Sequence, residues 1–212
     1  MHQASHAQPI LAIRALGRRF GEHEILRGFD LTVSAGDRVA LLGPNGSGKT
    51  TMLRCVAGTL KPTNGSVLIC GHRAGSVEAR RMIGVSFSQE RSFYMRLSGR
   101  ANLLVFARVR GHSRGSARRI VTELEQELEL EEILRERADQ CSTGMLQQLG
   151  FARALLGDPP LLLLDEPTRS LDECAVTRLW NAIGRRANTA LLLATHRQED
   201  IELCGRRIDL SP

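Results

Sequence analysis

The 212-residue sequence has no apolar run approaching the length of about eighteen residues that a membrane-spanning helix needs. We therefore expect that the chain does not cross a membrane itself. Residues 1–8 contain no apolar stretch, which argues against a signal peptide. Aromatic side chains make up only 4% of the chain, so few rings are available to stack on nucleic-acid bases. The formal charge of +6 is compatible with nucleic acid, but it is spread along the chain and no nucleic-acid partner is expected.

The five cysteines show no spacing typical of a metal site, and their total is odd. They most simply stay reduced, which suits a cytoplasmic location. Repeats and low-complexity linkers are also missing, and 42% apolar residues are enough to fill one substantial core. The sequence therefore predicts a single domain over residues 1–212. Its positive charge favours anionic partners, namely a nucleotide and the cytoplasmic membrane surface.

A glycine-rich segment lies between an apolar run at residues 39–42 and a segment with helical spacing. It consists of Gly43, Pro44, Asn45, Gly46, Ser47, Gly48, Lys49, Thr50 and Thr51. Its glycines allow backbone N–H groups to cradle phosphate oxygens, Lys49 supplies a cation to the β- and γ-phosphates, and the Thr50 hydroxyl can ligate Mg²⁺. The strand and helix on either side argue against a chance match, so the segment predicts a nucleotide-binding protein.

Polar residues follow further apolar strands. Residues 161–164 run into Asp165 and Glu166, which places one carboxylate to hold Mg²⁺ and a second beside the γ-phosphate as a base for water. Residues 190–194 end in Thr195 and His196, and Gln89 closes a short strand at residues 83–87. These segments indicate which kind of nucleotide-binding protein the chain is, because the phosphate loop alone is shared by many classes.

In their order and spacing these motifs resemble those of the ATP-binding cassette (ABC) ATPases, from about residue 10 to residue 210. The resemblance implies that ATP and Mg²⁺ are the cofactors and that the chain is an ATP hydrolase. It also implies that the protein powers a separately encoded transmembrane permease from the cytoplasmic face of the membrane. Two cassettes, identical or different, are expected to dimerise head to tail. Each ATP then lies between the phosphate loop of one subunit and the signature segment of the other, here residues 141–145.

The expected fold is α/β, with a P-loop NTPase core around a mainly parallel sheet. Strands at residues 39–42, 83–87, 161–164 and 190–194 form that sheet, and residues 9–42 suit an antiparallel β edge subdomain. Helical spacing at residues 103–109, 120–134 and 145–156 predicts an inserted α-helical subdomain. This gives a core of about residues 9–89 and 157–212 and a helical subdomain of about residues 90–156. The acidic run at residues 123–132 is most simply a solvated face, with contact to a partner as the alternative.

The resemblance implies four catalytic residues. Glu166 is the general base, and His196 contacts the γ-phosphate and the attacking water. Lys49 holds the phosphates. Gln89 matches the glutamine that touches Mg²⁺ and water and links the site to the membrane partner, although neighbouring Glu90 could compete for that alignment.

Other positions match binding roles. Thr50, Gln89 and Asp165 are the expected metal ligands. Ser142 and Gly144 in the signature segment face the nucleotide of the other subunit, and a helix N-terminus at Ser142 offers free N–H groups for a phosphate. Two positions could have a structural role in place of, or in addition to, a binding role. Phe20 matches the aromatic residue that stacks on adenine but could be a core residue, and Asp172 matches the aspartate of the dimer seam but could cap the next helix.

The signature departs from the usual Leu-Ser-Gly-Gly-Gln by having Cys141, Thr143 and Met145 at its first, third and fifth positions. A similar variant occurs in the exporter branch for polysaccharides, lipids, drugs or peptides, so we expect export. Phe93 and Tyr94 are either a packing patch or the place where the membrane subunit docks.

Two other functions remain open. One is a soluble ABC-type ATPase acting on the ribosome or DNA, although such proteins usually join two cassettes or carry a long coiled-coil insertion. The other is a regulatory nucleotide-binding module.

Overall fold

The computed structural model describes residues 8–87 and 92–210, so Gln89 and Glu90 lie outside the described residues. The described strands are β1 (Leu11–Phe20), β2 (His23–Val33), β3 (Arg38–Leu42), β4 (Asn64–Ile69), β5 (His72–Arg73), β6 (Ile83–Phe87), β7 (Leu161–Asp165), β8 (Ala190–Ala194) and β9 (Arg206–Asp209). The described helices are α1 (Lys49–Ala57), α2 (Val77–Arg81), α3 (Gly99–Val109), α4 (Arg114–Leu128), α5 (Glu131–Arg135), α6 (Thr143–Leu155), α7 (Glu173–Arg185) and α8 (Gln198–Glu202). The fold is α/β, as the sequence predicts.

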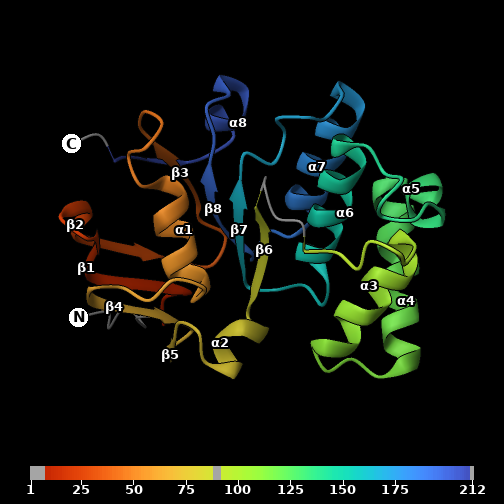
Figure 1. The fold of residues 1–212 in the computed structure, drawn as a ribbon, viewed down its shortest axis with the longest axis horizontal. Coiled ribbons are helices and arrows are strands. Elements are labelled where there is room, and N and C mark those ends of the chain that lie inside the picture. Colours follow the sequence, from red (N-terminus) through yellow and green to blue (C-terminus); the bar gives the residue numbers. More distant parts are fainter. Residues whose placement is uncertain (1–7, 88–91, 211–212) are drawn as a thin grey trace, which may run out of the picture.

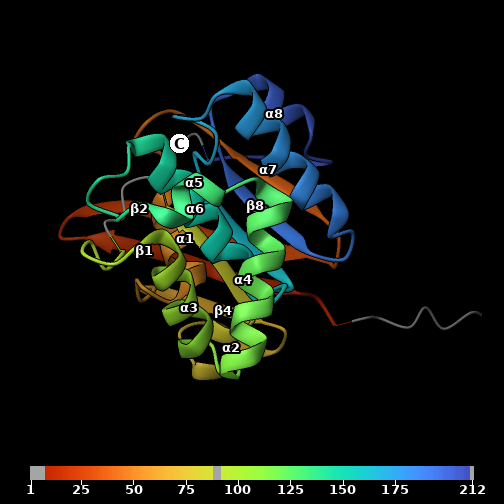
Figure 2. The same cartoon turned by 90° about the vertical axis from the view of Figure 1, so that its right-hand side faces the viewer.

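The elements are arranged in layers around a parallel sheet with the strand order β6-β7-β8-β3-β9. A separate antiparallel sheet has the order β2-β1-β4-β5. In Figure 1, α1 lies between the two sheets, and α6 and α7 cover the opposite face of the parallel sheet. Helices α3, α4 and α5 form the outermost layer, and Figure 2 shows α3 and α4 from that side.

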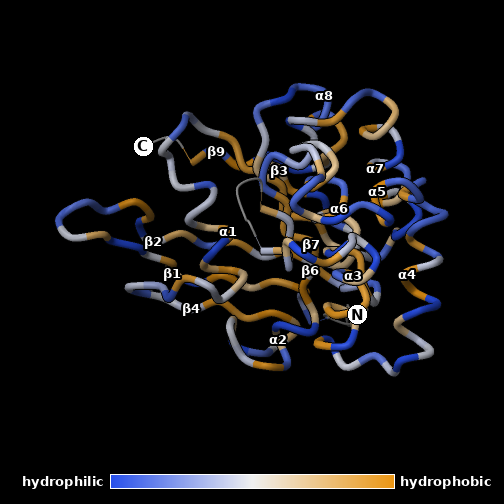
Figure 3. Tube along the Cα trace, turned by 45° about the vertical axis from the view of Figure 1, so that its right-hand side comes forward, coloured by the Kyte–Doolittle hydropathy of each residue, from blue (hydrophilic) through white to orange (hydrophobic). Residues whose placement is uncertain are grey.

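Alternating side chains of the central strands fill two hydrophobic cores. In β7, Leu161 and Leu163 pack into the core shared with α1 and the antiparallel sheet, whereas Leu162 and Leu164 pack into the core shared with the helices of the other face. This alternation follows from the two-residue period of a strand. Because both faces are covered, the strands read as continuous apolar runs, which appear as the hydrophobic centre of Figure 3.

The expected strands at residues 83–87 and 190–194 are confirmed with the same bounds. The single helix expected at residues 120–134 is wrong. Helix α4 ends at Leu128 because Glu129 adopts a left-handed conformation with φ of 53°, and α5 starts after Leu130. Residues other than glycine rarely adopt that backbone conformation, so the hydrophobic periodicity of the sequence did not indicate the break between the two helices. None of the helices in the described part of the chain is long and apolar enough to cross a membrane.

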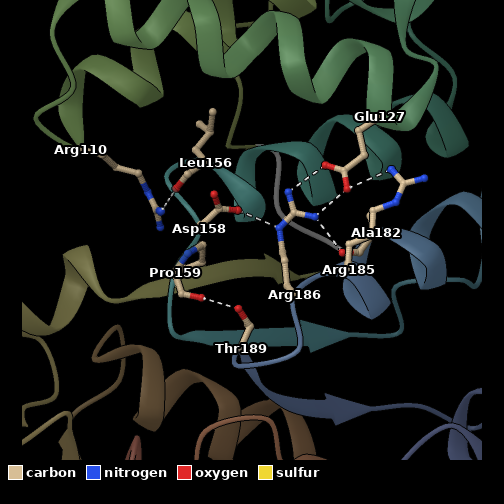
Figure 4. Close-up of polar contacts among 9 residues, drawn as sticks. All are labelled: Arg110, Glu127, Leu156, Asp158, Pro159, Ala182, Arg185, Arg186 and Thr189. Atoms are coloured by element: carbon tan, nitrogen blue, oxygen red, sulfur yellow. Dashed lines mark hydrogen bonds and ion pairs between the residues drawn. The ribbon is translucent and has the colours of Figure 1, made fainter.

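The acidic run at residues 123–132 is not simply a solvated face. Glu127 on α4 is only 14% exposed, and its two carboxylate oxygens each accept a hydrogen bond of 2.8 Å from the guanidinium of Arg186, which is also 14% exposed. Arg186 lies at the end of α7 and also pairs with Asp158 through Nε at 2.9 Å. Figure 4 shows this cluster, which links α4 to two loops that adjoin the parallel sheet.

Burial by itself would raise the pKa of Glu127, but the hydrogen bonds and charge of Arg186, together with Arg185, outweigh it and hold that pKa below its ordinary value. The carboxylate therefore stabilises the fold at pH values above the pKa of an unfolded glutamate, about 4.3. That contribution is lost as the pH falls through the lower pKa of the folded state.

We predict that Glu127→Gln lowers the free energy of unfolding by about 1–3 kcal/mol at pH 7, because Arg186 loses a charged acceptor while remaining partly buried. Urea unfolding at pH 7 and at pH 3.5 checks this, and the difference from the wild type should shrink at the lower pH. Glu129→Gln is the matched control because Glu129 is 67% exposed in its pair with Arg178. Equal effects of the two variants would contradict the prediction.

Candidate functional site

The glycine-rich loop connects β3, which ends at Leu42, to α1, which begins at Lys49. Gly48 caps α1 with φ of 100°, a conformation that strongly favours glycine. A Cβ atom at Gly48 would also lie only 2.9 Å from the Leu26 side chain on β2. The loop can therefore follow this path because glycine permits both the conformation and the close approach to β2.

The loop fits a phosphate group. The Ser47 hydroxyl is buried and has no hydrogen-bond partner within the described residues, so it is available to a ligand. Lys49 is 8% exposed, and its Nζ donates hydrogen bonds of 2.6 Å to the Gly43 carbonyl and 3.0 Å to the Pro44 carbonyl. This ammonium group lies over the loop, where a phosphate oxygen is a competing partner for the same protons.

Asp165 ends β7 directly opposite the first turn of α1. Its Oδ2 accepts a hydrogen bond of 2.8 Å from the Thr50 hydroxyl, so these two oxygen ligands are already adjacent. Burial raises the pKa of Asp165, opposed by the Thr50 hydrogen bond and by the charges of Arg54 and Lys49. A carboxylate and a hydroxyl beside a phosphate cradle are the ligand types that Mg²⁺ takes, together with substrate oxygens.

Glu166 and His196 face each other from the ends of β7 and β8. The His196 Nε2 atom lies 3.4 Å from Glu166 Oε1 and 3.1 Å from Asn45 Oδ1 in the phosphate loop. Burial raises the pKa of Glu166, and the nearby His196 opposes that rise. A glutamate with a raised pKa is a stronger proton acceptor than an exposed one, as general-base chemistry requires.

These groups line one cleft of about 750 Å³. Its lining comes from both sheets, α1 and the loops after β7 and β8, and consists of Phe20, Ile25, Asn45, Gly46, Gly48, Lys49, Thr50, Thr51, Arg54, Phe87, Asp165, Glu166, Arg169, His196 and Arg197. Phe20 is 45% exposed and is therefore not a core residue. The Arg18 guanidinium lies 4.2 Å from the centre of the Phe20 ring and holds it by a cation–π contact.

The signature residues lie apart from this cleft. Ser142 is exposed and caps α6 by accepting a hydrogen bond of 3.2 Å from the Met145 N–H, while its own O–H stays available as a donor. A Cβ atom at Gly144 would lie 2.6 Å from the Ser170 carbonyl oxygen, so glycine is needed there for packing within the same chain. Asp172 caps α7 through the Ala175 N–H at 2.8 Å, which confirms the capping role that the sequence suggested.

Several residues around the site were missed at the sequence level. Arg54, Arg169 and Arg197 line the cleft, where they add positive charge that suits a polyphosphate. No motif singled them out, because arginine is common along this chain. Arg54 lies on the helix after the phosphate loop, and Arg169 and Arg197 closely follow β7 and β8 in the sequence. These positions could have indicated that the three arginines lie near the site.

Asp200 on α8 was also missed, although it is fully buried. Its Oδ2 accepts hydrogen bonds from the Thr168 hydroxyl, in the loop after Glu166, and from the Thr195 hydroxyl at 3.1 Å, next to His196. Its Oδ1 accepts a third bond of 2.9 Å from the Trp180 ring nitrogen. One buried carboxylate therefore ties together the two loops that carry Glu166 and His196.

The sequence comparisons agree with this geometry. Residues 26–169 match the family described as ABC transporter. The chain therefore belongs to the ABC transporter family, as an ATP-binding domain of that family. It is 38% identical to the "Uncharacterized ABC transporter ATP-binding protein YdbJ" of Bacillus subtilis, over 95% of this chain and 66% of that protein. It is also 38% identical to the Nod factor export ATP-binding protein I of Burkholderia lata, over 91% of this chain and 65% of that protein. The chain thus spans just under two thirds of the length of these relatives.

Solved structures confirm the ABC ATPase fold. An ATP-binding subunit of an ABC transporter superposes with a TM-score of 0.87 at 27% identity, covering 94% of this chain and 85% of that one. A dimeric ATP-binding cassette in a post-hydrolysis state, bound to ADP and Pi, superposes with a TM-score of 0.84 at 26% identity, covering 94% and 93% of the two chains.

We predict that Asp200→Ala lowers the free energy of unfolding by at least about 2 kcal/mol, because two buried hydroxyl donors and the partly buried Trp180 N–H lose their acceptor together. Urea unfolding followed by tryptophan fluorescence measures this, since Trp180 is the only tryptophan and is one of the three donors. Glu202→Ala, at an exposed position of the same helix, is the control. A loss no larger than in the control would show that the three contacts contribute little.

Proposed function

We propose that this chain binds and hydrolyses ATP as the ATP-binding subunit of an ABC transporter and powers a separately encoded membrane permease. The observation that carries this proposal is the single cleft in which the phosphate loop, Asp165, Glu166 and His196 meet. These residues come from the ends of three adjacent parallel strands, β3, β7 and β8. A cation for phosphates, a metal-binding carboxylate and a proton acceptor for water are the groups that phosphoryl transfer to water requires.

The phosphate loop holds the triphosphate in this proposal. Its backbone N–H groups and the Ser47 hydroxyl bind phosphate oxygens, and Lys49 neutralises charge on the β- and γ-phosphates. Thr50 and Asp165 would hold Mg²⁺, together with Gln89 as the resemblance implies. The metal would supply charge neutralisation at the phosphates. Phe20 presents its ring to adenine, supported by Arg18.

Glu166 is the general base that accepts a proton from the attacking water. The water oxygen then bonds to the γ-phosphorus while the bond to the β–γ bridging oxygen breaks, which releases ADP and phosphate. His196 lies 3.4 Å from the Glu166 carboxylate and orients water and γ-phosphate against it. Asn45 contacts the same histidine at 3.1 Å and so links its position to the phosphate loop.

The same proposal includes a head-to-tail dimer, with a second copy or with a different cassette. Ser142 and Gly144 do not line the cleft of their own chain. The exposed N-terminus of α6 is thus available to the γ-phosphate of the partner's nucleotide, with Asp172 at the seam. The dimeric post-hydrolysis cassette with the same fold supports the formation of a dimer.

A membrane permease would dock on the helical side of the molecule. Tyr94, Met95 and Leu97 are exposed apolar residues before α3, whereas Phe93 is partly buried in an edge-to-face contact with Phe106. We assign α3 to α6 to the helical subdomain of about residues 90–156, and we place the protein at the cytoplasmic face of the membrane. Relatives named for Nod factor export support export as the direction of transport.

Two alternative functions predict different partners. A soluble ABC-type ATPase would bind the ribosome or DNA, and a regulatory module would bind nucleotide without turning it over. The paired carboxylate and imidazole of Glu166 and His196 favour hydrolysis over the second alternative.

We predict that Glu166→Gln reduces ATP turnover by at least about 100-fold, because the amide cannot accept the proton of water. ATP binding should persist, since Lys49 and the phosphate loop are unchanged, and MgATP should trap the variant as a dimer. Phosphate release and light scattering measure the two effects. Glu202→Gln is the exposed control, and wild-type turnover in Glu166→Gln would remove Glu166 from the role of base.

The transporter assignment has its own test. We expect tagged Glu166→Gln, expressed in its native cell and purified from solubilised membranes, to bring down a membrane protein with many spanning helices in the presence of MgATP. Lys49→Ala, which should lose the nucleotide, is the control and should bring down less. Recovery of ribosomes or DNA without such a membrane protein would favour the soluble alternative and leave the nucleotide chemistry intact.

A further inference from the structure

Glu166 has a strained backbone. Its φ is 50°, in the left-handed region that residues other than glycine rarely adopt. Such a conformation costs free energy and persists only where the surrounding contacts determine it. The contacts that hold this one residue therefore decide where its carboxylate lies.

Three hydrogen bonds hold the Glu166 backbone. Its N–H donates to the Ala194 carbonyl of β8 at 2.8 Å, which fixes the residue to the sheet. Its carbonyl accepts a bond of 2.6 Å from the Nε2 amide of Gln147 and a bond of 3.3 Å from the Arg169 N–H. The bond from Gln147 is the shorter of the two and the one that comes from outside the loop.

Gln147 lies on α6, about one turn after its first residue. Ser142 caps the same helix through the Met145 N–H, so the cap and the Gln147 side chain belong to one short, regular segment. The side chain of Gln147 is partly buried and spans from that helix to the loop after β7.

We propose that Gln147 is a positioning residue that holds Glu166 in its strained conformation and thereby links the signature helix α6 to the reacting carboxylate of the same subunit. The proposal rests on the role of Glu166 as general base. Gln147 does not line the cleft, and its side-chain hydrogen bond goes to the Glu166 backbone oxygen rather than to the carboxylate. A change in the placement of α6, such as contact of Ser142 with the nucleotide of a second subunit, therefore alters the position of Glu166.

The test separates turnover from binding. Gln147→Met keeps the side-chain length and removes the N–H donor, so kcat should fall by about 10- to 100-fold, as expected for a displaced catalytic group. The Kd for MgATP should stay within about twofold, because the phosphate loop is untouched. Gln147→Lys restores a donor at the end of a long side chain and should recover most of the lost turnover.

Gln148→Met is the matched control, because Gln148 is also partly buried on α6 but lines a small apolar crevice with Leu128 and Phe151. Gln147→Glu, which also lacks the donor, gives the same test if Gln147→Met fails to fold. Three results would each overturn the proposal: turnover in Gln147→Met equal to that in Gln148→Met, a parallel loss of ATP affinity, or no recovery in Gln147→Lys. Wild-type turnover in Glu166→Gln would instead reject the role of Glu166, so the two failures are distinguishable.

Discussion

Strands β3, β7 and β8 are buried on both faces, and this constraint determines where the chemistry of the molecule can lie. Side chains along such strands must be apolar, so charged and hydroxyl groups are confined to the strand ends. Because the strands are parallel, those ends meet at one edge of the sheet. The phosphate loop, the two carboxylates and His196 are neighbours for this reason, and the same burial raises the pKa values of Asp165 and Glu166.

The surrounding contacts hold these strand ends in place. Asp200 fixes the loops after β7 and β8 through two threonine hydroxyls, and Thr50 fixes Asp165 to α1. At the opposite ends of β7 and β8, Arg186 joins α4 to the loops that precede these strands.

The sequence alone predicted the features that depend on short-range pattern. Apolar runs of strand length located β6 and β8 with the observed bounds, and the polar residues that follow β3, β7 and β8 located most of the site. Glycine spacing indicated the loop because few other residues adopt its backbone conformations.

Contacts between distant positions could not be predicted in this way. Glu127 and Arg186 are 59 residues apart, and Thr168 and Asp200 are 32 apart, so no local pattern relates them. The acidic run looked solvated because nothing in the sequence related Glu127 to its partly buried partner Arg186. The end of α4 at Glu129 was missed for a similar reason, since a left-handed residue other than glycine gives no compositional signal.

The leucine run of β7 affects how the alignment of this strand with its neighbours is determined. Residues 161–164 are all leucine, so a slip by one position would keep leucine at three of the four positions and bring Pro160 or Asp165 to the fourth. Apolar packing at the three shared positions therefore does not distinguish the correct alignment from its neighbours. Polar contacts at the two ends of the strand do so: the Thr189 hydroxyl donates to the Pro159 carbonyl at one end, and Thr50 binds Asp165 at the other. Thr50 and Asp165, which would hold the metal, thus also fix the alignment of β7 in the sheet.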